Sequence, residues 1–185
     1  MKWFPVLLLS FCFFAAAHSL QAQEFPKRTY RVQLGLPFLP SLNVHMENRL
    51  SRNASLVAKI DAVAQFSASS SLGTSGSVAY VPSAELRWYY NMARRVEKGK
   101  SVQRFSGNFF SVEPFVKATE TRFGNSTLYP PPVYPGAGLL VNYGLQRGFG
   151  EHGHWGLCLG ITPVAVLDGQ YATVVKINFQ LGLQW

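Results

Sequence analysis

Histidine is the first side chain to consider for chemistry, because imidazole can bind a metal or act as a general base near neutral pH. Glu151, His152 and His154 lie in one short segment that could bind a metal weakly. No further carboxylate or cysteine lies at ligand spacing, so we expect a polar turn here and no metal or cofactor. A serine nucleophile needs a histidine beside it, and no serine stands two residues from His45, His152 or His154. We therefore assign no catalytic residue.

The two cysteines are unpromising as reactive groups. Cys12 lies within an apolar run near the N-terminus, preceded by Phe11 where a lipidation site would need a small residue. Cys158 lies in an alternating segment and is expected to be a small packed residue rather than a nucleophile. If the first 22 residues are removed, Cys158 has no partner within the chain for a disulfide.

Residues 1–22 have the features of a secretory signal peptide. Lys2 provides a positive start, an apolar run follows from Phe4 to Ala17, and small residues precede Gln23. A transmembrane anchor is the alternative, but the run is short for one. The 185-residue chain has a net charge of +8 and loses only Lys2 among its charged residues with this segment. We expect residues 23–185 to form one exported domain.

Polar and apolar residues alternate with period two through most of this domain, whereas helical periodicity is hard to find. In the last segment, Val175, Ile177 and Phe179 fall on one face, and Lys176 and Asn178 on the other. The pattern predicts eight strands, an even number that allows an antiparallel barrel to close. They are Tyr30–Leu36, Leu42–Arg49, Ala58–Phe66, Ala84–Asn91, Phe110–Thr119, Leu139–Gln146, Trp155–Thr162 and Tyr171–Trp185.

Charged residues repeat on the polar face of these strands. An eight-stranded barrel has an interior that its own side chains fill, and buried charges there must pair. We expect a salt-bridge network that plugs the barrel, with a conducting pore or a proton path as the alternative. Its predicted members are Arg31, Glu47, Arg49, Lys59, Asp61, Glu85, Arg87, Glu113, Lys117 and Lys176.

The connections and the aromatic residues suggest an orientation. Short turns are expected at 51–54 and 150–153, and longer extracellular loops at Ser67–Gly76 and Phe123–Pro132. With both termini in the periplasm, the longer basic turn Ala93–Ser106 also lies there. Large aromatic residues fall toward this same end, as an interfacial girdle would. They are Trp88, Tyr90, Phe110, Tyr143, Trp155 and Trp185.

Three prolines and a run of basic residues stand out from this pattern. Pro82, Pro114 and Pro163 cannot donate to a sheet ladder, so we expect bulges or strand ends near them. The basic run within the longer turn could contact anionic headgroups or a periplasmic partner, although a solvated turn is the simpler expectation. It comprises Arg94, Arg95, Lys98, Lys100 and Arg104.

Three stretches, 82–90, 136–146 and 177–185, together resemble the uncharacterised small outer-membrane β-barrel proteins of Bacteroidota, which are distantly similar to the OmpA and OmpX barrels. The resemblance implies an all-β, eight-stranded, up-and-down transmembrane barrel in a Gram-negative outer membrane, with a polar, side-chain-filled lumen. It also implies that Phe179, Leu181, Leu183 and Trp185 form a C-terminal signal for the barrel-assembly machinery. No functional residue is carried over, because the likeness is one of pattern.

The expected function is non-enzymatic, either in membrane integrity or in surface interaction through the loops. Outer-membrane lipids and lipopolysaccharide are the expected partners of a monomer, with no nucleic acid. One alternative is a lipid A-modifying enzyme in the same fold. Another is a secreted, soluble barrel that binds an apolar ligand, which would need apolar residues inside and polar residues outside.

Overall fold

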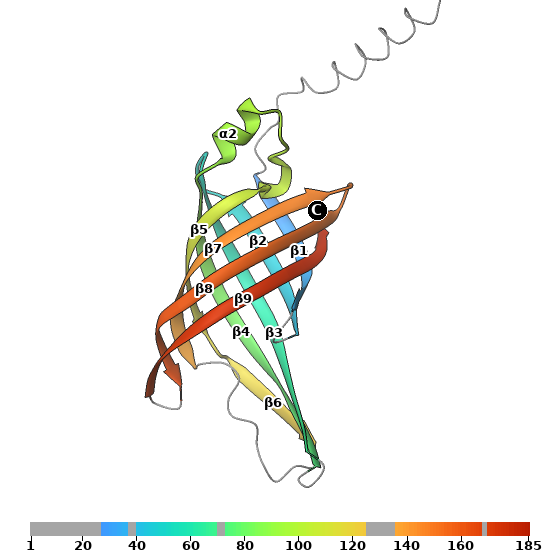
Figure 1. Cartoon of the computed structure of the whole chain (residues 1–185), viewed down its shortest axis with the longest axis vertical. Helices are drawn as coiled ribbons and strands as arrows, with labels where there is room; N and C mark the ends of the chain where they lie inside the picture. Colours follow the sequence, from blue (N-terminus) through green and yellow to red (C-terminus); the bar gives the residue numbers. More distant parts are fainter. Residues whose placement is uncertain (1–26, 37–39, 70–72, 125–135, 168–169) are drawn as a thin grey trace, which may run out of the picture.

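The protein forms a closed antiparallel β-barrel (Figure 1). The computed structural model describes residues 27–36, 40–69, 73–124, 136–167 and 170–185. The predicted signal peptide, residues 1–22, lies outside the described residues. The elements are β1 (Arg28–Leu36), β2 (Ser41–Arg49), β3 (Ala54–Ser69), β4 (Gly73–Tyr89), α2 (Met92–Glu97), η2 (Gln103–Phe105), β5 (Gly107–Val116), β6 (Thr119–Gly124), β7 (Ala137–Phe149), β8 (Gly153–Leu167) and β9 (Gln170–Gln184).

Strand pairing closes the sheet on itself. Successive strands from β1 to β5 and from β7 to β9 pair antiparallel, and β5 pairs with β7. The sheet closes where β1 pairs with β9, with Val32 opposite Leu183. Both β5 and β6 pair with β4, so they are two parts of one interrupted strand. The barrel therefore has eight strands, and the predicted all-β, eight-stranded antiparallel fold is confirmed.

The ladder is irregular near the prolines. Ser83 pairs with Phe115 and Tyr80 pairs with Thr119, which leaves one extra residue on the β5–β6 side between them. This bulge lies beside Pro82 and close to Pro114. A second register shift falls between Thr162 and Ala165, around Pro163. The irregularities lie where each proline removes a backbone donor.

One predicted loop is in fact paired strand. We expected a loop at Ser67–Gly76, but β3 and β4 remain paired as far as Ser69 and Gly73. With β6 they form a three-stranded extension beyond the barrel, here called the arm: residues 64–69, 73–78 and 119–124 (Figure 1). The edge of the Phe66 ring meets the Phe123 ring, with centroids 5.9 Å apart. A side chain at Gly76 would collide with the Phe123 ring, so the ring can pack here only because residue 76 is glycine. The other predicted loop, Phe123–Pro132, begins within β6, and its residues from 125 onward lie outside the described residues.

The long basic turn is also more structured than expected. Residues 90–106 contain the short helix α2 and the 3-10 turn η2, and this segment folds over one end of the barrel (Figure 1). We call it the cap. We expected a turn here and did not predict these short helical pieces. Nowhere in the described residues is a helix both long and apolar enough to cross a membrane.

Side chains alternate strictly between the two sides of the barrel wall. In β1, Tyr30, Val32 and Leu34 are exposed, whereas Arg31 and Gln33 are buried. The other strands of the barrel wall repeat this alternation, with apolar side chains outside and mostly polar ones inside. The exceptions are β6, which does not alternate, and a few buried apolar side chains such as Val57 and Phe115. The overall arrangement is the reverse of what a soluble barrel for an apolar ligand requires, and it contradicts that alternative.

Candidate functional site

Glu47 is the centre of a buried hydrogen-bond network inside the barrel. Its carboxylate accepts hydrogen bonds from the Arg31 guanidinium, the Ser55 hydroxyl and the Tyr89 phenol. Arg87 Nη1 lies 3.3 Å from the same carboxylate, and the Gln146 amide lies 3.4 Å from it. These partners come from β1, β3, β4 and β7, so the network ties β2 to strands on the opposite side of the wall.

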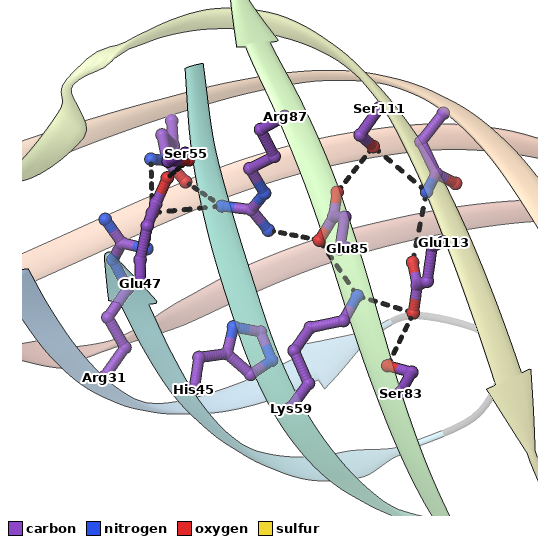
Figure 2. Close-up of polar contacts among 12 residues, drawn as sticks. Arg31, His45, Glu47, Ser55, Lys59, Ser83, Glu85, Arg87, Ser111 and Glu113 are labelled. Atoms are coloured by element: carbon purple, nitrogen blue, oxygen red, sulfur yellow. Dashed lines mark hydrogen bonds and ion pairs between the residues drawn. The ribbon is translucent and has the colours of Figure 1, made fainter. Parts of the chain in front are cut away.

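A second group of ion pairs continues from Arg87. Arg87 Nη2 donates to Glu85 at 2.7 Å, and Lys59 Nζ donates to the same Glu85 oxygen at 3.0 Å. Lys59 also pairs with Glu113. The other carboxylate oxygen of each glutamate accepts a hydrogen bond from a neutral side chain. Ser111 donates to Glu85, and Asn142 donates to Glu113 at 3.1 Å. Figure 2 shows these side chains meeting between β1, β2, β3, β4 and β5.

The other predicted members of the network occupy different positions. Asp61 is buried and lies 3.4 Å from the ring of His45. Lys176 borders the same interior space as Lys59 and Glu85. Arg49 is half-buried at the end of β2. Lys117 lies at the bulge and pairs with Glu120 at 3.0 Å, away from the network.

Several neutral residues of the network were not predicted as members. Gln146 donates to Tyr89 at 2.7 Å and accepts from Arg87 at 3.0 Å, and so links the two groups of ion pairs. The sequence signal that could have identified Gln146 and Tyr89 was their position, because both lie on the inward-facing, polar side of their strands. Alternation identifies an inward side chain, but it does not show which charge that side chain meets.

The cap closes one end of the barrel through both apolar and polar contacts. Five buried residues pack together there. Tyr89 and Phe109 come from the ends of β4 and β5, and the cap contributes Met92, Val102 and Phe105. Arg31 Nη2 donates to the Arg104 carbonyl at 2.8 Å, and the Gln146 amide donates to the Phe105 carbonyl at 2.8 Å. The network therefore holds the cap directly.

Side chains occupy the described part of the interior at both the cap end and the arm end. Toward the arm, the network gives way to a buried apolar cluster of Ala79, Val81, Phe115 and Leu140. The space bordered by Lys59, Glu85, Arg87, Cys158 and Lys176 has room for about one water molecule. Such an interior can hold charge and stabilise the wall.

The predicted turn histidines do not come together. His154 is buried in the barrel, whereas His152 is exposed, with its ring 3.6 Å from Glu151 and 3.2 Å from the Gln184 carbonyl. No cluster of three or more His, Cys, Asp or Glu side chains able to hold a metal occurs among the described residues. Cys158 is half-buried and borders the polar interior.

The predicted aromatic girdle lies on the outside of the barrel at the cap end. Trp88, Tyr90, Phe110 and Trp185 are exposed, and Tyr143 and Trp155 are half-buried. The rings of Tyr90 and Phe110 are 5.4 Å apart, and those of Phe110 and Tyr143 are 5.3 Å apart. The C-terminus lies at this same end (Figure 1). The alternating outward residues of β9, Phe179, Leu181 and Leu183, are exposed as well, and their role as an assembly signal stays a prediction.

Comparisons with known proteins add little to this description. No family model matches the chain, and no curated protein matches its sequence. Among solved structures, the chain is similar to Ail, the attachment invasion locus protein of Yersinia pestis, with a TM-score of 0.33 and 10% identity over 85% of this chain and 95% of that chain. A likeness at this level carries no inference about function, so the fold assignment rests on strand pairing, and the resemblance to Bacteroidota barrels stays a prediction.

Proposed function

We propose that this protein is a non-conducting integral barrel of a Gram-negative outer membrane, with a role in membrane integrity or surface interaction and not in catalysis. The observation that carries the proposal is the distribution of polarity across the wall. Large apolar side chains such as Leu34, Ile60 and Val175 are more than half exposed, while Arg31, Glu47 and Glu85 are buried. Water would penalise that arrangement, whereas a bilayer favours it, because lipid contacts the outside and polar groups pair inside.

The filled interior supports a structural role over transport. Ion pairs, the cap and the second apolar cluster together occupy the lumen. The charges in this interior pair with one another, as buried charges without water must. Reconstitution in planar bilayers tests this point. We expect no stable single-channel currents from protein whose folding is confirmed by its altered migration on unboiled gels. Steady channel events from such protein would contradict the proposal.

The arm supports a role at the cell surface. In the proposed orientation, the termini and the cap face the periplasm, and the arm projects outward. Single cysteines at Thr121 on the arm and Lys98 on the cap, in a Cys158→Ala background, test the orientation with a membrane-impermeant maleimide. We expect the arm cysteine to react in intact cells and the cap cysteine to react only after permeabilisation. Labelling of the cap in intact cells would reverse the assigned orientation.

A further inference from the structure

A cluster of polar groups lies on the outer surface at the cap end, where the phenol oxygens of two girdle residues meet Asn108 and Arg147. Tyr90 and Tyr143 bring their phenol oxygens to 3.1 Å from each other. The Asn108 amide nitrogen lies 3.2 Å from the first and 3.3 Å from the second. Arg147 then donates to the Asn108 amide oxygen at 2.6 Å. The two phenols, the Asn108 amide and the Arg147 guanidinium thus form one chain of hydrogen bonds beside the exposed Phe110 ring.

A second guanidinium approaches from the cap. Arg95 lies on α2, whose N-cap residue Asn91 accepts a hydrogen bond from the Asn108 backbone at 2.9 Å, and its guanidinium donates to the Ser101 carbonyl at 2.7 Å. In the described part of the chain, both guanidiniums contact only uncharged oxygens, since Arg147 binds the Gly107 and Gln146 carbonyls as well. Neither guanidinium pairs with a carboxylate among the described residues, so an anion beside them would stabilise their charges.

We propose that Arg95 and Arg147, with the phenols of Tyr90 and Tyr143, bind the phosphate of an anionic phospholipid headgroup. This inference rests on the proposed membrane location. Aromatic girdles mark the boundary between hydrocarbon and headgroups, so side chains just beyond the Tyr90–Phe110–Tyr143 rings lie at phosphate depth. Arginine forks match phosphate oxygens well, and the exposed rings below provide a surface for the upper acyl chain.

The depth and the chemistry favour a lipid over a soluble anion. A free phosphate would gain nothing from the exposed apolar rings of Phe110 and Trp88, which adjoin the cluster. A lipid engages both parts at once, because its chain covers the rings while its phosphate meets the guanidiniums. We expect each cation to contribute about a fivefold preference for an anionic headgroup.

Tryptophan quenching by brominated lipids measures that preference. Trp155→Phe and Trp185→Phe leave Trp88 as the fluorophore of the mature protein, next to Phe110 in the sheet. The protein is reconstituted in phosphatidylcholine vesicles that contain phosphatidylglycerol, with either lipid brominated near the headgroup end of its chains. We expect phosphatidylglycerol to bind beside Trp88 at least about fivefold more strongly than phosphatidylcholine. The R95Q/R147Q variant is expected to lose this preference.

Two sets of variants control for diffuse charge and for folding. R52Q/R94Q removes two exposed arginines from the same end and should keep the preference, because neither belongs to the cluster. Y90F/Y143F keeps every charge and should lower the preference roughly twofold through lost hydrogen bonds, which provides a test if R95Q/R147Q fails to fold. An equal loss in R52Q/R94Q, or no preference in the parent protein, would overturn the site.

Two further outcomes separate the possible failures. Inorganic phosphate, added against chloride at matched ionic strength, should leave the preference unchanged. If millimolar phosphate removes it, the cluster binds a soluble anion, and the lipid assignment is wrong. If neither brominated lipid quenches Trp88, the barrel wall does not contact the bilayer, and the proposed membrane location fails as well.

Discussion

Replacement of Glu47 by glutamine is the most direct test of the interior network. The side chain keeps its shape but loses its charge, while Arg31 and Arg87 remain buried beside it. Arg87 retains Glu85, but among the described residues Glu47 is the only carboxylate that Arg31 contacts. Breaking a buried ion pair by removing one partner costs about 3–5 kcal/mol, because the other charge stays uncompensated. We expect E47Q to lower the free energy of unfolding by about this amount.

Urea titration of the barrel in lipid vesicles, followed by tryptophan fluorescence, measures the change. Glu97→Gln provides the control, because Glu97 is exposed on α2 and its loss should change stability by less than about 0.5 kcal/mol. The double variant R31Q/E47Q should be less destabilised than the sum of its single variants, since it leaves no unpaired arginine at this position. A loss below about 1 kcal/mol for E47Q, with additive single effects, would refute the assignment of Glu47 as the centre of the network.

Three other substitutions test the packing, the cap and the assembly signal. A side chain at Gly144 would collide with the Phe109 ring, so G144A should destabilise the barrel by about 1–3 kcal/mol, whereas G156A, with ordinary contacts, should fold normally in the same urea titration. Phe105→Ala removes a buried ring from the cap and should lower the free energy of unfolding by roughly 3 kcal/mol. It should also speed tryptic cleavage within residues 94–100 of the folded protein, and unchanged cleavage would argue against a packed cap. Trp185→Ala should slow assembly in cells, measured by pulse-chase and gel mobility, with little effect on refolding in detergent, because the ring is exposed; equal slowing in both settings would argue against a recognition signal.

Period-two alternation was enough to predict the two sides of the wall. One face of each strand is buried, so each residue's phase fixes whether it points into the barrel. Arg31, Glu47 and Glu85 could therefore be assigned to the interior from sequence alone. Their partners could not, because contacts such as Gln146 with Glu47 join residues 99 apart and depend on how the strands are staggered around the barrel.

The cap and the arm were missed for different physical reasons. In the cap, Arg104 and Phe105 adopt positive φ angles of 49° and 61°, which non-glycine residues rarely adopt. Contacts with Arg31 and Gln146 hold this conformation, so no local signal encodes it. In the arm, the Ser- and Gly-rich composition favours a loop, yet pairing across three strands and the Phe66–Phe123 contact maintain extended structure.

Closure and stability of this barrel are one property, because the same side chains provide both. Arg31 contacts Glu47 with one nitrogen of its guanidinium and the Arg104 carbonyl of the cap with another. Gln146 likewise joins Glu47 and Tyr89 to the Phe105 carbonyl. Displacing the cap would leave the buried donors of Arg31 and Gln146 without these acceptors, and unsatisfied buried donors are costly. An opening that admits solutes therefore requires partial loss of the network, so a variant that conducts should also be less stable.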